Sequence, residues 1–347
     1  MDGLEVPGRS RKAGHDPPVV HGSRSWERPD RKSPVPLSCC HPRSYATLLA
    51  VVLVAITVLI GACSANVAPR LVYRDYVALG DSWTADVGTT LPPTTQFVPF
   101  GCFQSSTDYP HQVAALLHVA TFRDASCSGA TTDDMAYPQS VLLGGVNPPQ
   151  FDRLTKATDL VTLGIGGNDI GLVGDVVDCL NLLPGGLGLP ASLGGSCQAR
   201  FDAGGTDRIA QAIAATEPKL VQTIEGIRLR SPHARILLVN YLDAIPANGV
   251  GCWPVVPIEN QDVAYLQAKF LQMNDMLAEA ARVTHAQLVD TYSATLGHDV
   301  CQAPNVRYVE GLVPLSLNPP GLAFPLHPNA AGAAAQTRAV YAAILDR

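Results

Sequence analysis

Five short apolar runs that alternate with longer stretches of helical periodicity constrain the fold of this chain most strongly. The runs, whose length and flanking Gly, Asp, Asn and Ser residues are typical of strands, lie at residues 76–79, 119–125, 160–165, 234–241 and 287–291. Helices are expected at residues 108–118, 206–230, 262–283 and 328–345. Strands that alternate with helices form a parallel sheet covered on both faces. We therefore expect an α/β fold with a five-stranded parallel sheet.

The first of these runs ends in the turn Gly80-Asp81-Ser82. In an open parallel sheet, ligands bind at the carboxyl ends of the strands. Ser82 would then stand at the mouth of a crevice. A Gly-Asp-Ser turn alone is more often ordinary turn chemistry than a nucleophile. Three later segments favour a nucleophile over an ordinary turn. They are Ser128-Gly129-Ala130-Thr131, residues 164–169 (Gly-Ile-Gly-Gly-Asn-Asp) and His327-Pro328-Asn329.

In this order the four segments resemble the four blocks of the SGNH (GDSL-type) hydrolases, a family of serine esterases and lipases. The resemblance extends to the secreted actinobacterial members of that family. It implies a flavodoxin-like three-layer sandwich with the strand order 2-1-3-4-5. In that order the first and third strands end side by side at the switch point, so Ser82 and Asn168 would meet there.

The same resemblance implies roles for single residues. Ser82 would be the nucleophile and His327 the base. The oxyanion donors would be the backbone N–H groups of Ser82 and Gly129 and the side-chain amide of Asn168. A glycine lets the backbone approach a ligand closely, and an asparagine amide donates without needing a protonation state. Asp169 would hold the turn that orients Asn168. His298 is an alternative histidine that could face the substrate.

One position departs from the pattern of the family. An aspartate usually stands three residues before the histidine, whereas here Phe324 occupies that position. We expect the backbone carbonyl of Phe324 to orient His327 instead, because Pro325 restricts Phe324 to an extended conformation. The alternative is a relocated triad in which Asp299 or Glu310 supplies the carboxylate.

The expected function is that of an exported serine esterase or lipase that hydrolyses carboxylic esters of small molecules or lipids through an acyl-enzyme. No cofactor is implied, and no Cys-x-x-Cys or histidine cluster with the spacing of metal ligands is visible in the sequence. The net charge of −6 and the lack of a basic stripe argue against nucleic acid as a partner. We expect a monomer. The alternatives are an acyltransferase of the same fold and a non-catalytic envelope lipoprotein.

The N-terminal part of the chain differs from the rest. Residues 1–44 are rich in Arg, Lys, Pro and Ser, which is typical of a disordered basic leader. Residues 45–63 form an apolar signal or anchor segment. It ends in Ile-Gly-Ala-Cys, which resembles the bacterial lipobox, so Cys63 is expected to be lipidated and to anchor the protein to the membrane of the cell envelope. An uncleaved anchor, plain secretion and a start downstream of Met1 are the alternatives. Residues 70–347 would then form one hydrolase domain.

Six cysteines follow Cys63, and an even number in an exported chain indicates disulfides. Six cysteines allow fifteen connectivities. Pairing in sequence order resembles the bridges of the secreted actinobacterial members, and it gives Cys102–Cys127, Cys179–Cys197 and Cys252–Cys301. The segment 171–205 would then be a long stapled loop, and the Thr-, Pro- and Gly-rich segment 84–107 would be a surface loop near the active-site mouth.

Overall fold

The computed structural model describes residues 72–181, 195–313, 315–317 and 320–346. Contacts along the chain divide it into two units, Met1–Ala68 and Pro69–Arg347, and all described residues belong to the second. The expected leader, the anchor segment and Cys63 lie outside the described residues. In the part of the chain that is described, no helix is both long and apolar enough to cross a membrane.

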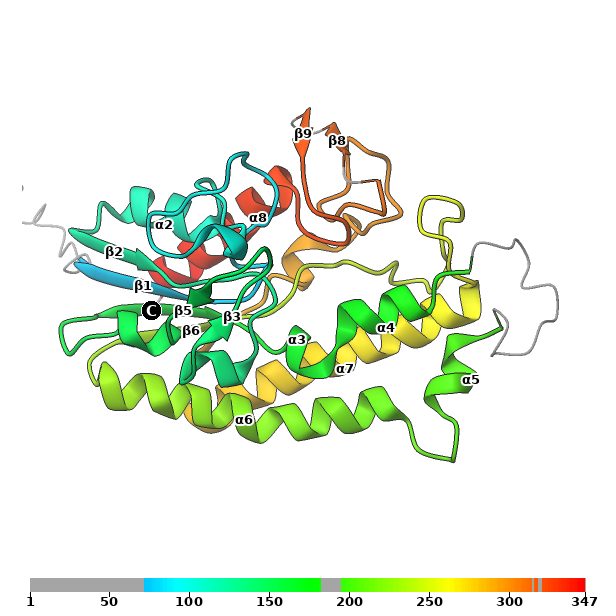
Figure 1. Cartoon of the computed structure of the whole chain (residues 1–347), viewed down its shortest axis with the longest axis horizontal. Coiled ribbons are helices and arrows are strands. Elements are labelled where there is room, and N and C mark those ends of the chain that lie inside the picture. The colour runs from blue at the N-terminus through cyan, green and yellow to red at the C-terminus, as the bar shows by residue number, and fades with distance from the viewer. Residues whose placement is uncertain (1–71, 182–194, 314, 318–319, 347) are drawn as a thin grey trace, which may run out of the picture. The chain divides into compact units, whose positions relative to one another are not determined.

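A five-stranded parallel sheet forms the centre of the second unit (Figure 1). Its strands are β1 (Asp75–Gly80), β2 (Thr121–Asp124), β5 (Leu160–Gly164), β6 (Arg235–Val239) and β7 (Gln287–Val289). They lie in the order β2-β1-β5-β6-β7, which is 2-1-3-4-5 when the strands of this sheet are counted along the chain. The expected topology is therefore confirmed. Gly80 pairs with Gly164, so β1 and β5 end side by side.

Helices cover both faces of the sheet (Figure 1). On one face lie α2 (Tyr109–Leu117) and α8 (Ala330–Leu345), which pack against each other. On the other face α6 (Arg208–Arg230) packs against α7 (Asn260–Thr284). Successive strand residues point to opposite faces, so β1 contributes Tyr76 and Ala78 to one core and Val77 and Leu79 to the other. The result is the expected three-layer sandwich.

Shorter α-helices and two strand pairs accompany these elements, as do 3₁₀ helices at Phe100–Cys102, Thr132–Met135, Gln150–Arg153 and Ser293–Thr295. The shorter α-helices and the strand pairs are α3 (Gly167–Ile170), α4 (Leu172–Asp178), α5 (Cys197–Phe201), the strand pair β3 (Gln139–Ser140) and β4 (Val146–Asn147), and the strand pair β8 (Leu315–Leu317) and β9 (Pro320–Leu322). Two of these helices correct an expectation. The segment 171–205 is not one irregular loop, because α4 and α5 occupy much of its described part.

The segment 84–107 also differs from the surface loop that its composition predicts. It is irregular apart from one short 3₁₀ turn, but Val87, Gln104 and Ser105 are buried. Gln104 Nε2 donates to the carbonyl of Ser126 at 3.0 Å, and the Cys102–Cys127 disulfide ties the segment to the chain beyond β2. These links hold part of the loop against the end of the sheet, whereas Leu91, Phe100 and other residues of the segment are exposed.

Three disulfides staple the described chain. They join Cys102 to Cys127, Cys179 to Cys197 and Cys252 to Cys301. This is the pairing that the family resemblance implies. The first bridge lies beside the Ser128-Gly129 segment, and both cysteines of the third line the cavity described below.

Candidate active site

The turn after β1 is fixed by backbone packing around Gly80. A Cβ atom at this position would lie 2.6 Å from the carbonyl oxygen of Gly164, so no other residue fits between the ends of β1 and β5. The side-chain amide of Gln150 donates to the Gly80 carbonyl and accepts from its N–H, both at 2.8 Å. Thr84 adds a hydroxyl bond to the Gly164 carbonyl at 3.2 Å. Ser82 is therefore carried by a rigid turn.

Ser82 and His327 meet although 245 residues separate them in the chain. Ser82 Oγ lies 2.8 Å from His327 Nε2, and both side chains are buried. The other ring nitrogen, Nδ1, lies 2.7 Å from the carbonyl oxygen of Pro325. A carbonyl only accepts, so Nδ1 carries the proton and Nε2 accepts from the Ser82 hydroxyl. Burial lowers the pKa of His327 to about 4, an effect that the bond to Pro325 opposes, and the ring is therefore neutral at pH 7.

The carbonyl that orients the histidine belongs to Pro325, so the expectation of Phe324 is wrong. Residues 324–327 form a β-turn in which the His327 N–H donates to the Phe324 carbonyl at 3.2 Å, and Leu326 has φ of +61°. Proline at the second position and a positive φ at the third are typical of a type II turn. The turn itself uses the Phe324 carbonyl, whereas the Pro325 carbonyl faces the ring.

The two carboxylates that could complete a relocated triad form hydrogen bonds with groups other than the His327 ring. Asp299 accepts from the Cys301 N–H and from Gln302 Nε2, both at 2.8 Å. Glu310 accepts from Arg307 and Asn329, each at 2.7 Å.

Glu310 nevertheless supports the histidine through its backbone. Its N–H donates to the His327 carbonyl at 3.0 Å, and its carbonyl accepts from the Leu326 N–H at 3.0 Å. His298 has a structural position instead: its Nδ1 donates to the Val306 carbonyl at 2.6 Å, and its ring stacks on Tyr308 with centroids 3.8 Å apart.

Asn168 and the Gly129 segment are joined by hydrogen bonds. Asn168 stands in the first turn of α3, and its Nδ2 donates to the Ala130 carbonyl at 2.8 Å. The next residue, Asp169, accepts from the backbone N–H of Thr132 at 3.0 Å and from its hydroxyl at 2.5 Å. Gly129 has φ of +76°, a conformation that favours glycine. The turn around Gly129 and the start of α3 are thus held as one unit.

Tyr241, which could not be singled out from the sequence, connects the turn that carries Ser82 to the start of α3. Its hydroxyl donates to Asp81 Oδ2 at 2.5 Å and accepts from the Gly167 N–H at 2.8 Å. Asp81 Oδ1 in turn accepts from the Trp83 N–H at 2.9 Å. Burial raises the pKa of Asp81 to about 6, and the bond from Tyr241 opposes that rise. The one sequence signal for Tyr241 is its place just beyond the fourth strand, at the edge of the sheet where Ser82 lies.

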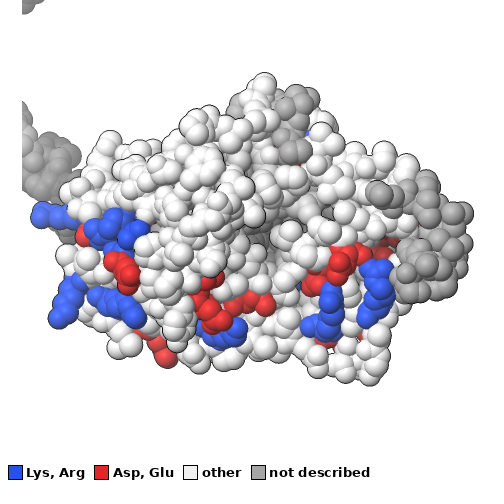
Figure 2. Space-filling view, in the orientation of Figure 1, with Lys and Arg blue, Asp and Glu red and all other residues white. Residues whose placement is uncertain are grey.

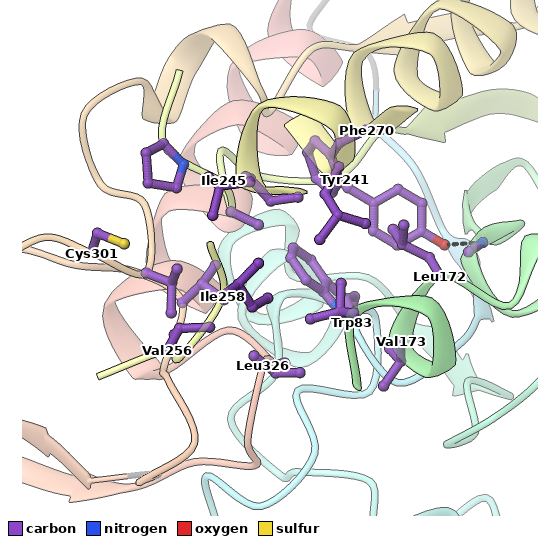
Figure 3. Close-up of a pocket in the computed structure, with 18 of the residues that line it drawn as sticks. Trp83, Leu172, Val173, Tyr241, Ile245, Val256, Ile258, Phe270, Cys301 and Leu326 are labelled. Atoms are coloured by element: carbon purple, nitrogen blue, oxygen red, sulfur yellow. Dashed lines mark hydrogen bonds between the residues drawn. The ribbon is translucent and has the colours of Figure 1, made fainter. Parts of the chain in front are cut away.

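A cavity opens beside Ser82 and is lined mainly by apolar side chains (Figure 3). Trp83, Tyr241, Leu172 and Val173 lie on one side of it, with Ile245, Val256 and Ile258 opposite. Asp81, Ser82, Asn168 and Tyr241 supply polar side chains, all at the serine end. Figure 2 shows that one face of the molecule is hollowed near its centre and that charged side chains lie mostly below this hollow.

Comparison with known proteins gives a consistent assignment. Residues 78–335 match the GDSL-like Lipase/Acylhydrolase family model. Lipase 2 of Streptomyces coelicolor is 36% identical over 276 residues, which is 78% of this chain and 85% of that protein. A lipase of Streptomyces rimosus is 30% identical over 259 residues, covering 75% of this chain and 85% of that protein.

Solved structures support the fold. The extracellular lipase from Streptomyces rimosus superposes with a TM-score of 0.60 at 23% identity, covering 78% of this chain and 99% of that chain. Phospholipase A1 from Streptomyces albidoflavus superposes with a TM-score of 0.59 at 22% identity and the same coverage. The chain therefore belongs to the GDSL-like lipase/acylhydrolase family, whose members are carboxylic ester hydrolases.

Proposed function

We propose that this esterase works through a Ser82–His327 dyad and a covalent acyl-enzyme. The observation that carries the proposal is the pair of bonds on the histidine ring, with Nε2 on Ser82 Oγ at 2.8 Å and Nδ1 on the Pro325 carbonyl at 2.7 Å. His327 takes the hydroxyl proton as Ser82 attacks the acyl carbon, and it returns that proton to the leaving alcohol. Water then attacks the acyl carbon and gives a proton to the same nitrogen. The bond between Ser82 Oγ and the acyl carbon breaks, His327 returns the proton to Ser82 Oγ, and the acid is released.

The Pro325 carbonyl replaces the carboxylate of an ordinary triad. It fixes the tautomer and the ring orientation, but it carries no full charge with which to stabilise the imidazolium that forms during attack. Burial makes that imidazolium still less favourable, which agrees with the direction of the shift in the pKa of His327. The dyad therefore depends strongly on donors that stabilise the negative oxygen of the tetrahedral intermediate.

Three such donors are proposed, namely the backbone N–H groups of Ser82 and Gly129 and the amide of Asn168. An asparagine amide has two N–H bonds. One of them donates to the Ala130 carbonyl and fixes the amide, and the second is the proposed donor to the oxyanion. Preorganised donors of this kind commonly contribute about 10²–10³ in kcat each.

The acyl group of the ester would occupy the cavity beside Ser82. The apolar side chains that line it, such as Leu172, Val256 and Phe270, favour an apolar acyl chain over a charged one. The leaving alcohol would then face the outside of the molecule. Hydrolysis of carboxylic esters with apolar acyl groups is therefore the proposed reaction.

Substitution of the nucleophile tests the proposal. Ser82→Ala should lose nearly all turnover of a short p-nitrophenyl ester and all labelling by a fluorophosphonate probe, while its unfolding transition stays close to that of the parent. Ser140→Ala, at an exposed serine in β3, is the matched control and should behave like the parent protein. Undiminished turnover by Ser82→Ala would reject the assignment.

We also propose that the protein is exported and anchored to the cell envelope through Cys63, with residues 70–347 as a monomeric hydrolase domain outside the membrane. Three disulfides suit an oxidising compartment, and the Ile-Gly-Ala-Cys motif suits lipidation. Cys63→Ser should move the protein out of the membrane fraction or leave an unprocessed precursor. A mature chain that begins at another residue, detected by mass spectrometry, would contradict this.

A further inference from the structure

A second polar cluster lies at the start of α2, and none of its residues lines the cavity. It consists of Asp108, which caps α2, His111 in the first turn of that helix, and Asp124, the last residue of β2. His111 Nδ1 lies 2.6 Å from Asp108 Oδ1 and 3.8 Å from Asp124 Oδ2. One potential ligand atom from each residue lies within 4.8 Å of the other two. The fold thus brings together a histidine and two carboxylates.

The cluster has buried acceptors without donors. The side chains of Asp108 and Asp124 are fully buried, and Oδ2 of each has no hydrogen-bond partner. None of the ion pairs between described residues joins either carboxylate to a lysine or an arginine. Buried carboxylate oxygens are normally hydrogen-bonded, paired with a cation or bound to a metal. A positively charged ligand would satisfy both oxygens at once.

We propose that Asp108, His111 and Asp124 bind one divalent transition-metal cation of the Zn²⁺ or Mn²⁺ type. Two carboxylates and a neutral imidazole match the charge of such a cation and the nitrogen and oxygen ligands that it accepts. Ligand atoms held at about 2.1 Å in a tetrahedral arrangement lie about 3.4 Å apart. In the cluster, His111 Nδ1 lies 2.6 Å from Asp108 Oδ1 and 3.8 Å from Asp124 Oδ2, so a bound cation would replace the first of these contacts and would require the three side chains to rotate.

The role of this site is structural. Asp124 Oδ1 accepts from the Ser126 N–H at 2.9 Å, and Ser126 also receives a bond from Gln104. A cation would therefore fasten the start of α2 to the chain that leads from β2 into Cys127 and the Gly129 segment. His111, whose side chain is 17% exposed, provides the entry path for the ion. No metal is expected from the sequence because it shows no Cys-x-x-Cys and no histidine cluster with the spacing of metal ligands, and the fold alone brings Asp124 to the other two residues.

Metal analysis of the full-length protein, purified without a metal-affinity tag, tests the proposal. After dialysis against EDTA and then against 10 μM Zn²⁺ or Mn²⁺, elemental analysis should find one equivalent of bound metal. Thermal unfolding should shift upward on addition of the metal and back after chelation. Asp124→Asn and Asp108→Asn should each lose the bound metal and the thermal response. Asp152→Asn, at an exposed aspartate outside the cluster, is the matched control and should keep both.

Two results would overturn the proposal, and the first needs only the parent protein. In the first, the protein binds less than a tenth of an equivalent of either metal, and neither metal changes its melting temperature. This result would mean that Asp108 and Asp124 share a proton instead of binding a cation. Under that assignment Asp108→Asn would stabilise the chain, since an amide supplies the donor without a buried charge. Full metal binding by both Asp108→Asn and Asp124→Asn would place the metal elsewhere.

Discussion

Removal of the Tyr241 hydroxyl tests whether one side chain positions both the turn that carries Ser82 and the start of α3. Tyr241→Phe keeps the ring, which packs edge-on against Trp83, and deletes only the bonds to Asp81 Oδ2 and to the Gly167 N–H. Both groups are then left without this partner in a buried region. Because Asp81 adjoins Ser82 and Gly167 adjoins Asn168, the change acts on two parts of the proposed site without touching either residue.

The size of the effect follows from the two lost bonds. A hydrogen bond to a charged group contributes about 1.5–3 kcal/mol, and an unpaired buried N–H costs about 1–3 kcal/mol. Some of this is recovered when the turn relaxes, so the free energy of unfolding should fall by about 2–4 kcal/mol. Relaxation of about 1 Å at a reacting group lowers the rate about 10²-fold. We therefore expect kcat to fall about 10- to 100-fold while KM for a soluble ester changes little.

The pH dependence of stability distinguishes the hydrogen bond of the Tyr241 hydroxyl to Asp81 from the packing of the Tyr241 ring. Burial already raises the pKa of Asp81 to about 6, above its unfolded value of 3.8, so ionised Asp81 destabilises the fold as the pH rises through 6. Without the bond from Tyr241 that pKa rises further. Urea unfolding at pH 5 and pH 8 should therefore show a larger loss of stability for Tyr241→Phe at pH 8. Tyr265→Phe, which deletes a bond to Asp207 outside the cavity, should lower stability but leave kcat unchanged.

Two outcomes would refute this reasoning. Equal destabilisation of Tyr241→Phe at pH 5 and pH 8 would show that Asp81 is not the group that the hydroxyl stabilises. A kcat equal to that of the parent protein would show that the turns around Ser82 and Asn168 keep their positions without the bridge.

Three further predictions concern the histidine and the cavity wall. The acid limb of kcat/KM, measured on a soluble ester, should centre near pH 4, since burial lowers the pKa of His327 to about 4; a limb near 6.5 would contradict this. By the same shift, His327 contributes stability that is present above pH 6.5 and is lost as the pH falls through 4. Phe324→Ala should keep kcat/KM within about threefold, because the Pro325 carbonyl survives; a loss as large as that of His327→Ala would implicate the Phe324 side chain. The double variant Cys252→Ser/Cys301→Ser should lose about 2–4 kcal/mol in urea unfolding, and unchanged stability would contradict the role of that bridge.

The sequence predicts those parts of the site that depend on strand ends. Ser82 and Asn168 each follow a run that reads as a strand, and the order 2-1-3-4-5 alone makes those strands neighbours. His327 could be placed through its family motif and the helix that follows it. The strand order is confirmed, and it decides which strand ends meet, whereas the roles of Ser82 and Asn168 stay predictions.

Other features depend on contacts that no local pattern encodes. The bridge formed by Tyr241 requires the chain after β6 to approach the turn after β1, and the pairing of Asp108 with Asp124 requires α2 to start beside the end of β2. The choice of the Pro325 carbonyl over that of Phe324 depends on the positive φ of Leu326, a conformation that leucine rarely adopts. The sequence gives no warning of it.

A histidine oriented by the main chain changes how tolerance to mutation is distributed over the protein. In a triad the acid is a third position at which almost every substitution is harmful, whereas no side-chain substitution here deletes the acceptor. A saturation-mutagenesis map should then show no third minimum for an acid beside those of Ser82 and His327, but a short zone at residues 324–326 where tolerance follows backbone preference. Glycine suits the left-handed conformation of Leu326, and β-branched residues do not. In directed evolution, this zone is where the orientation of the base can be tuned gradually.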